Sequence, residues 1–389
     1  LPGGKTVTVM YLLFQYLSLI TSNNGYGGYT FGDSMDLIST GSYAYRLTNP
    51  DLTWETQEQL NFGIDARFLN NRLGFEFDWY NKNTRDWLVT APVLSSFGAN
   101  AVSVNGGNVK NTGIEVGLHW NDNIGKDFQY GANLTLAHNK NEVTKIANKD
   151  GIIHGSGSVL WEGAEECFRA EVGKPIGYFY GYKVEGVYQT QEEIEHSPKN
   201  TLATVTPGDL KFRDVNGDGE ITTADRTMIG NPTPDVTYGF TLGLGYKNWE
   251  LAVDMMGQGG NQIYRTWDNY NWSQFNFMEQ RMDRWHGEGT SNTQPLLNTK
   301  HTINNLNSEY YIEDGSFFRI RNVSLAYNFD KALISKIGMQ ALKLYVNIQN
   351  LKTWKHNTGY TPELGGSAIA SGWTTAVIRC RRFIRSDLI

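Results

Sequence analysis

LNFGIDARFLNNRLGFEFDWY, residues 60–80, is the stretch that decides the fold. Apolar and polar residues alternate on both sides of the short segment Leu69-Asn70-Asn71. Successive side chains of a β-strand point to opposite faces, so each half is predicted to be a strand with one apolar and one polar face. The two halves then form an antiparallel hairpin. The apolar positions are Leu60, Phe62, Ile64, Ala66 and Phe68 before the turn, and Leu73, Phe75, Phe77 and Trp79 after it.

The same hairpin pattern recurs three times along the chain. Residues 114–120 and 128–136 flank a turn at 121–126, and residues 236–246 and 249–255 flank Lys247-Asn248. Residues 323–327 and 342–348 flank a longer turn at 330–341, whose apolar residues lie near helical spacing. Strands of about 9–11 residues have the length that a tilted strand needs to cross a bilayer. Aromatic residues near the strand ends are typical of membrane interfaces; they are Phe68, Trp79, Trp120, Phe128, Tyr246, Trp249 and Tyr327.

The connections between hairpins are much longer than the turns within them. They run near residues 83–109, 139–235 and 259–315. A soluble sandwich or propeller also alternates, but compact soluble domains rarely carry such connections. Outer-membrane barrels combine short periplasmic turns with long external loops. We therefore predict an all-β fold, an antiparallel transmembrane β-barrel with long external loops and its short turns in the periplasm.

Composition and charge limit the classes of function that the chain can have. The chain has 389 residues and a formal net charge of −6, and its charges are spread along the sequence. This argues against a nucleic-acid surface, which needs clustered Lys and Arg. The mean hydropathy is −0.44. The longest apolar stretch, residues 9–20, is shorter than the roughly 20 residues of a spanning helix. The two cysteines, Cys167 and Cys380, are far apart and form no metal-binding motif.

Six ordered blocks then resemble the SusC/RagA family of TonB-linked outer-membrane transporters. The resemblance covers about residues 45–366. The blocks are NPDLTWETQEQLNFGIDARFLNNRLGFEFDWYNKNTRDWL, GGNVKNTGIEVGL, VGKPIGYFYGYKVEGVYQ, PGDLKFRDVNGDGEITTADRTMIGNPTPDVTYGFTLGLGYKNWEL, YIEDGSFFRIRNVSLAYNF and LKLYVNIQNLKTWKHNTGYTPEL.

The resemblance implies a large barrel of about 22 strands with an internal plug. This chain would supply about ten strands, the C-terminal part of that barrel, over residues 15–372. The implied function is TonB-dependent import of glycans or oligosaccharides, with peptides as the other substrate class. The implied partners are a SusD-like surface lipoprotein, membrane lipid, and the TonB complex through the missing N-terminal part. The implied location is the outer membrane of a Gram-negative bacterium of the Bacteroidetes type.

Both ends depart from the family pattern. Residues 1–14 lack its polar strand-and-turn character, and residues 373–389 carry four arginines where a closing strand is expected. Arginine at the midplane of a lipid-facing surface costs about 2–4 kcal/mol. We interpret both segments as read in a shifted frame, a hypothesis that translating the parent DNA in its other frames would test.

One loop has the spacing of a calcium site. Residues 214–225, DVNGDGEITTAD, follow a D-x-N-x-D-G-x-I pattern in which oxygen ligands occupy fixed positions. The predicted metal residues are Asp214, Asn216, Asp218, Glu220 and Asp225. An aspartate replaces the usual glutamate at position twelve. The alternative is a turn whose Asx side chains satisfy its own backbone. Structural Ca²⁺ is the expected cofactor, with no organic cofactor.

Aromatic residues in the third external segment are candidates for contact with a sugar ring, with loop packing or contact with a lid protein as the alternatives. They are Trp267, Tyr270, Trp272 and Trp285. Polar positions on the strands could touch solute or plug, although a water-filled lumen needs polar residues in any case; they are Glu76, Asp78, Asp254, Lys343, Asn347 and Gln349.

No catalytic signature is present. The seven histidines are scattered, and the sequence has no HExxH, G-x-S-x-G or P-loop motif. We expect no enzyme activity. The competing interpretation is a surface-exposed β-rich binding or adhesin protein with a calcium-stabilised loop.

Overall fold

The computed structural model describes most of the chain. The described residues are 4–7, 19–22, 28–30, 38–40, 42–46, 48–90, 103–155, 165–266, 279–297, 303–359, 361–367, 369–373 and 383–388.

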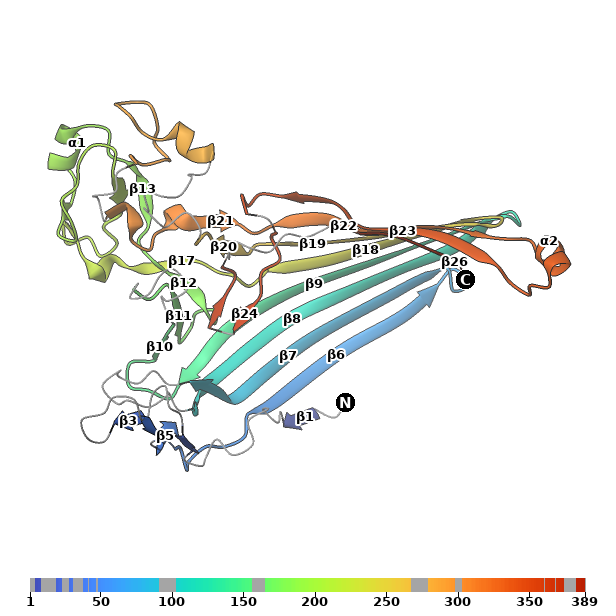
Figure 1. Ribbon diagram of the computed structural model, residues 1–389, viewed down its shortest axis with the longest axis horizontal. Coiled ribbons are helices and arrows are strands. Elements are labelled where there is room, and N and C mark those ends of the chain that lie inside the picture. The colour runs from blue at the N-terminus through green and yellow to red at the C-terminus, as the bar shows by residue number, and fades with distance from the viewer. Residues whose placement is uncertain are drawn as a thin grey trace.

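One ten-stranded sheet, which we call the wall, dominates the molecule (Figure 1). Every neighbouring pair in it is antiparallel. In spatial order its strands are β1 (Gly4–Val7), β6 (Thr56–Phe68), β7 (Leu73–Thr90), β8 (Ser103–Ile124), β9 (Phe128–Ile146), β18 (Val236–Tyr246), β19 (Trp249–Gly259), β22 (Phe317–Asn328), β23 (Lys343–Lys355) and β26 (Phe383–Leu388). The predicted count of about ten strands is confirmed.

The four short turns lie together at one end of the wall. The pairs Phe68–Leu73, Ile124–Phe128 and Tyr246–Trp249 each close a hairpin at that end. In the fourth hairpin, Asn328 pairs with Lys343, and the intervening turn holds helix α2 (Lys331–Ile334) and the 3-10 turn η7 (Ser335–Ile337). The predicted grouping of the turns and the short helix are both confirmed. The long connections leave the opposite end (Figure 1).

Three wall strands are longer than predicted. β7, β8 and β9 have 18, 22 and 19 residues, where alternation indicated about 9–11. Residues 83–90, 103–109 and 139–146, assigned above to external loops, therefore continue the strands. The reason is a change of environment: near this end Trp87, Val89, Val109, Val143 and Ile146 are buried against one another, so the alternation that marks a lipid-facing strand disappears.

The long connections fold into a second region, which we call the cap: the described residues of 165–235 and 260–316. Its elements are β11 (Phe168–Glu171), β12 (Tyr178–Gly181), β13 (Val184–Val187), α1 (Gln191–Glu195), β14 (Lys199–Asn200), β15 (Leu210–Phe212), β16 (Glu220–Ile221), η3 (Thr223–Asp225), β17 (Thr227–Gly230), β20 (Gln262–Tyr264), η4 (Glu279–Asp283), η5 (Ile303–Asn305), η6 (Glu309–Tyr311) and β21 (Ile312–Asp314). The remaining strands are β2 (Leu19–Ser22), β3 (Gly28–Thr30), β4 (Ile38–Thr40), β5 (Ser42–Arg46), β10 (Ile152–His154), β24 (Gly366–Ser367) and β25 (Ala370–Ser371).

The wall is an open sheet within the described residues. β1 pairs with only four residues of β6, and β26 pairs with six residues of β23. The register of β26 sets Arg385 opposite Asn347, while the other three C-terminal arginines lie outside the described residues. The shifted-frame interpretation of both ends stays a prediction. No helix in the described part of the chain is long and apolar enough to cross a membrane.

Candidate functional site

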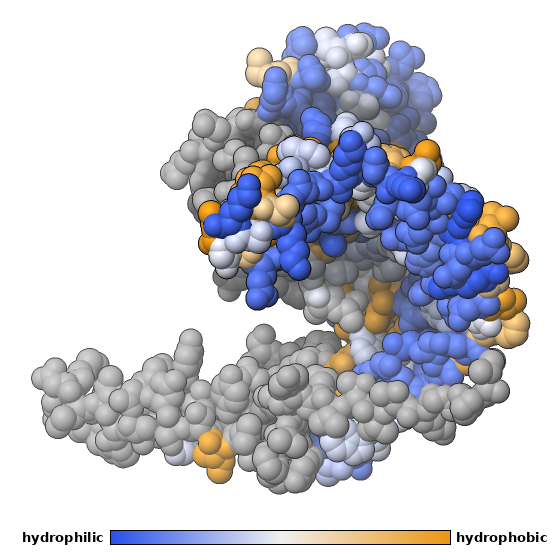
Figure 2. All heavy atoms as spheres, turned by 90° about the vertical axis from the view of Figure 1, so that its right-hand side faces the viewer, coloured by the Kyte–Doolittle hydropathy of each residue, from blue (hydrophilic) through white to orange (hydrophobic). Residues whose placement is uncertain are grey.

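The two faces of the wall have opposite chemistry. Leu60, Phe62 and Ile64 of β6 share one face, and each is about half exposed. The register sets Phe62 opposite Trp79 and Ile64 opposite Phe77, so the apolar residues of neighbouring strands form one surface. The other face carries the charged and amide residues. In Figure 2, hydrophobic residues line the outer side of the curved sheet and hydrophilic residues lie on its inner side.

A chain of polar contacts crosses four strands on the polar face. Arg67 Nη2 of β6 donates to Glu76 Oε1 of β7 at 3.3 Å. Glu76 Oε2 lies 3.1 Å from His119 Nε2 of β8, and His119 Nδ1 lies 3.0 Å from Asn133 Oδ1 of β9. Glu76, which was predicted to face the lumen, thus links β7 to both neighbouring strands through its side-chain contacts.

Further along the polar face, two more carboxylates are held in the same way. Glu250 accepts from Lys343 at 2.6 Å and from Asn328 at 2.7 Å. Asp254 accepts from Thr241 at 3.1 Å. Near the turns this face is hollowed by a cavity of about 1040 Å³ that is lined by residues of six strands, among them Asn121, Gln129 and Lys343. A polar, hollowed inner face is what a water-filled lumen requires.

The apolar face carries two aromatic bands. At the turn end, the rings of Trp249 and Tyr327 lie 4.8 Å apart. At the other end, Tyr238 stacks on Phe318, which stacks on Trp354, at 6.4 and 5.5 Å. Tyr238 and Tyr246 are eight positions apart on β18, about 27 Å along the strand. With a tilt of about 35–45°, this becomes roughly 20 Å, close to the apolar band of about 25 Å in an outer-membrane barrel.

The cap has two buried apolar clusters of its own. One contains Phe168, Phe179 and Tyr264, and the other contains Tyr182, Leu210 and Phe212, with each of these side chains at most 2% exposed. The Tyr182 and Phe212 rings are stacked at 4.8 Å. Burial on this scale stabilises a folded structure in these connections, which the sequence pattern predicted to be external loops.

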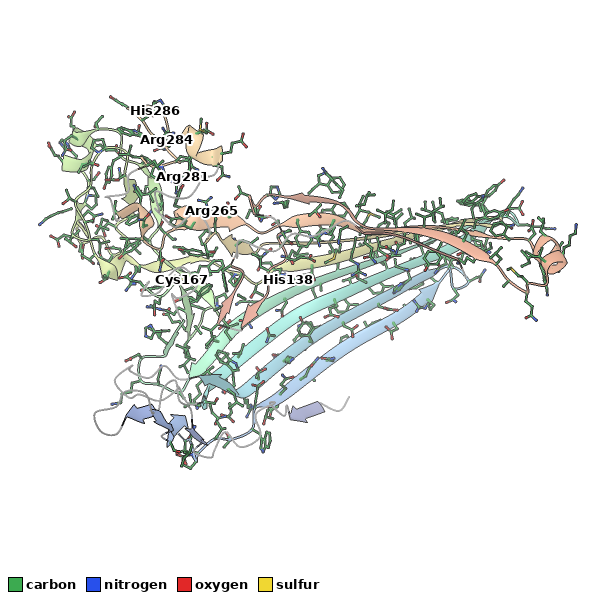
Figure 3. All side chains as sticks on the ribbon, in the orientation of Figure 1. His138, Cys167, Arg265, Arg281, Arg284 and His286 are labelled. Atoms are coloured by element: carbon green, nitrogen blue, oxygen red, sulfur yellow. The ribbon has the colours of Figure 1, made fainter. Side chains whose placement is uncertain are left out.

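Arginines inside the cap are structural. Arg265 and Arg281 are 4% and 7% exposed. Their guanidinium carbons lie 5.1 and 5.4 Å from the centre of the Tyr310 ring, and Arg265 also pairs with Glu313 at 3.0 Å. Figure 3 shows Arg265, Arg281 and Arg284 within the cap, above the end of the sheet. Cation–π contacts hold the side chains of Arg265 and Arg281 inside the cap, and Arg265 is also held there by its ion pair.

The loop 214–225 is organised by its own backbone. Asp214 accepts from the N–H groups of Gly217 at 2.6 Å and Gly219 at 2.8 Å. Asp225 is fully buried and accepts from Val215 and Thr222. Asn216 and Asp218 accept from residues two positions ahead, and Glu220 lies exposed. No three carboxylate or histidine groups of the described residues gather in a way that could hold a metal. Calcium binding by these residues stays a prediction from the motif.

Of the four aromatic candidates, only Trp285 lies in the described residues. Trp267, Tyr270 and Trp272 lie outside them. Trp285 packs against the second apolar cluster of the cap, and its Nε1 donates to Gln189 Oε1 at 3.2 Å. Its contacts are those of loop packing.

Burial and hydrogen bonding shift the pKa values of three titratable groups in the cap. Burial raises the pKa of the Tyr182 phenol to about 12 and the pKa of the Cys167 thiol far above its usual range. A thiol in that state supplies no thiolate nucleophile at neutral pH. The backbone N–H of Gln189, and then Lys211, hold the pKa of the Glu193 carboxylate below its usual range.

One wall residue was missed by the sequence reasoning. Arg321 sits at an irregularity of β22, between Ile320 and Asn322. The signal was present in the sequence, because the apolar positions step by two at Phe318 and Ile320 but by three to Val323. A step of three inside a period of two marks a β-bulge.

Comparison with known proteins gives the same fold. Residues 7–351 match the family model described as TonB dependent receptor-like, beta-barrel. TonB-dependent receptor P3 of Formosa agariphila is 32% identical over 82% of this chain and 31% of its own length. TonB-dependent receptor SusC of Bacteroides thetaiotaomicron is 26% identical over 94% of this chain and 35% of its own. A solved structure of the RagAB peptide transporter superposes with a TM-score of 0.78, at 22% identity, over 99% of this chain and 39% of that one. The chain thus spans about a third of the length of the curated relatives it matches.

Proposed function

The chain belongs to the TonB-dependent receptor β-barrel family, a family of outer-membrane transporters, and on that premise we propose that it forms less than half of the wall of an importer of glycans or oligosaccharides. SusC among its relatives and the SusC/RagA-type fold support this assignment. Receptors of this kind are outer-membrane proteins of Bacteroidetes, and the wall is the part that spans that membrane. A peptide is the second substrate class, since a structural neighbour is a peptide transporter.

The observation that carries the proposal is the polarity of the wall. Apolar residues cover one face and end in aromatic bands, and polar residues cover the hollowed other face. A soluble β protein buries its apolar face against another layer. A barrel wall instead exposes its apolar face to lipid on the outside and its polar face to water on the inside. This polarity also disfavours the adhesin alternative.

The proposed orientation follows from the connections. The four short turns face the periplasm and the cap faces the outside, as in other outer-membrane barrels. We propose that the cap lies at the barrel mouth, where a SusD-like lipoprotein would contact it. The TonB complex would act through the part of the receptor that this chain does not include.

Uptake by the intact receptor tests the proposal. In the host bacterium, deletion of the whole receptor gene should abolish uptake of its fluorescently labelled oligosaccharide while surface binding by the lipoprotein persists. An uncoupler that collapses the proton-motive force should have the same effect on the wild-type cell. Unchanged uptake after deletion, with every oligosaccharide and peptide tested, would contradict the importer assignment.

Calcium binding at residues 214–225 has its own test. In the intact receptor, calcium should protect the peptide bond after Arg226 from trypsin over a saturable concentration range, while magnesium should not. Equal cleavage with and without calcium would leave the loop held by its own hydrogen bonds alone.

A further inference from the structure

The longest of the four turns, residues 330–341, has a folded structure of its own. Asp330 Oδ1 accepts a hydrogen bond from Asn248 Nδ2 of the neighbouring turn at 2.8 Å. Ile334 of α2 is only 3% exposed, and its carbonyl oxygen accepts from the N–H of Met339 at 3.1 Å. Side chains that remain exposed on this turn are therefore part of its folded surface.

Two large aliphatic side chains lie on the outside of this turn. Leu333 is 62% exposed and Ile337 is 67% exposed. They are four positions apart on the consecutive helical segments α2 and η7, and residues at that spacing lie on the same side of a helical turn. We call this pair the turn patch. A contiguous exposed apolar group marks a surface that meets a partner or a membrane.

The turn patch continues the apolar surface of the wall. The Phe329 and Tyr327 rings meet edge to face at 4.9 Å, and Tyr327 belongs to the aromatic band at the turn end. The N–H of Phe329 donates to the Leu342 carbonyl oxygen at 3.0 Å, so strand pairing extends to the start of the turn. Leu69 and Ile124, at the turns of two other hairpins, are also exposed. An apolar rim over several turns fits a continuous medium better than one docked protein.

The height of the turn matches the headgroup layer of a bilayer. Lys331, the first residue of α2, follows Tyr327 by four positions, or about 13 Å of extended chain. With a strand tilt of about 35–45°, this is roughly 10 Å along the membrane normal. The polar layer on each side of the hydrocarbon core is about 5–8 Å thick, and Figure 1 shows α2 at the far end of the wall. Phospholipid headgroups would therefore surround the start of α2.

The turn also carries two cations without a counter-charge. Lys331 and Lys336 are exposed, and neither makes an ion pair within the described part of the chain. Asp330, the one carboxylate of residues 330–341, is engaged by its amide partner. A lysine beside an apolar surface can lay its alkyl chain along that surface while its ammonium group reaches the polar layer. Basic residues at this level are attracted to anionic lipids.

We propose that residues 330–341 form an interfacial anchor in the inner leaflet of the outer membrane. The turn patch faces the acyl chains, and Lys331 and Lys336 meet the phosphates of phospholipid headgroups. Anchored in this way, the turn fixes the height of the β22–β23 hairpin in the membrane. The inference rests on the proposed function, because it needs the wall to span the outer membrane with its short turns in the periplasm.

Spin labels on the intact receptor, in bilayers of phosphatidylethanolamine and phosphatidylglycerol, test the anchor. With Cys167 and Cys380 replaced, Leu333→Cys and Ile337→Cys would each carry a label. Power saturation then compares collisions with oxygen, which concentrates in lipid, and with a water-soluble nickel chelate. The oxygen-to-nickel ratio should be roughly threefold higher at both positions than in the control Ser335→Cys. Ser335 is matched because residues two positions apart on a helix do not share a face.

A label at Val346→Cys, on the exposed apolar face of β23, separates this inference from the proposed function. A nickel-dominated signal there would contradict the membrane wall and the anchor with it. With position 346 in lipid, a nickel-dominated signal at 333 and 337 would overturn the anchor alone. Protection of both positions from both agents would overturn it too, because protein would then cover the patch.

The contact with phosphate has its own readout. Replacing Lys331 and Lys336 together by glutamine should lower the oxygen-to-nickel ratio at position 337 by roughly twofold, because the turn loses its attraction to the headgroups. An unchanged ratio would overturn the role given to the two lysines. None of these measurements needs uptake, so a receptor that transports nothing could still show the anchor.

Discussion

The wall and the cap bury their apolar residues in opposite directions. In the cap, large side chains such as Phe168, Phe179 and Phe212 lie in closed clusters with almost no exposed surface. In the middle of the wall, Ile64, Leu118 and Leu325 stand on an open face, between 37% and 48% exposed. The cap buries its large apolar side chains, as a protein in water does. The wall exposes them on one face, as a barrel in lipid does.

The difference shows how one chain can be stable in lipid in one region and in water in another. Each wall hairpin satisfies its backbone through its neighbours, so its side chains need only match the medium on each face. The cap has short strands and few ladder bonds, so it depends on its interior contacts. In the cap, a substitution should accordingly lower the free energy of unfolding by removing buried contacts. In the wall, the effect of a substitution should depend on whether the residue faces lipid or water.

The largest effect is expected in the cap core. Phe212→Ala removes a ring that is 2% exposed and stacked on Tyr182, at a cost of about 3–5 kcal/mol. Limited proteolysis of the receptor should show rapid cutting within the cap, while the heat-modifiable gel migration of the barrel persists. Val215→Ala, at a 44% exposed cap position, is the control and should change neither. Loss of barrel migration in Phe212→Ala would mean that the two regions are not separable.

A second effect separates the two faces of the wall. Val323 and Ser324 are neighbours on β22, on the apolar and polar faces respectively. Val323→Arg places a charge near the bilayer midplane and should destabilise the barrel by about 2–4 kcal/mol. Ser324→Arg places the same charge in the lumen and should cost much less. Urea unfolding of the receptor in lipid bilayers measures both, and equal costs would argue against the assignment of faces.

A smaller effect is expected in the loop 214–225. Asp225→Ala leaves the N–H groups of Val215 and Thr222 without their buried acceptor, at about 1–3 kcal/mol for an unsatisfied group. Hydrogen exchange at these amides should accelerate. Asp218→Ala, which removes one acceptor at an exposed position, is the control. Matching exchange rates in the two variants would remove Asp225 from its anchoring role.

The smallest expected effect is the response of the cap to acid. The pKa of Glu193 is lowered on folding from its ordinary 4.5, so its stabilising contribution is present above that pH and is lost as the pH falls through the folded pKa. The pair with Lys211 at 3.0 Å is partly exposed, so we expect less than about 1 kcal/mol. Protease resistance of the cap should fall below about pH 4.5 in the wild type and less in Glu193→Gln. An identical acid response would exclude Glu193 as the cause.

Sequence alternation predicted the wall because each strand has lipid on one face and water on the other, so its own residues alternate between apolar and polar. Leu60, Phe62 and Ile64 identify a face without knowledge of any neighbour. The four turns and the short helix after Asp330 were predictable for the same reason. Strand ends were not, because at Trp87 and Val109 the apolar residues meet other protein and the period of two is lost.

The cap and the candidate sites depend on contacts between distant residues. Tyr182 meets Phe212 and Ile303 across the chain, and no local pattern encodes that meeting. The motif at 214–225 was recognised, but a sequence cannot tell whether Asp225 points at an ion or at its own backbone. Arg321 was visible only as a break in alternation, whose meaning required the register of both neighbouring strands.

The most direct test of the account is the accessibility of β18 in the intact receptor, reconstituted in lipid. With Cys167 and Cys380 replaced, single cysteines along residues 238–245 would each carry a fluorophore, quenched either by brominated lipid or by an aqueous quencher. The account predicts that positions 238, 240, 242 and 244 respond to the lipid quencher, and that 239, 241, 243 and 245 respond to the aqueous one. A uniform response along the strand, or the two sets exchanged, would contradict the claim that this sheet is the wall of a membrane barrel.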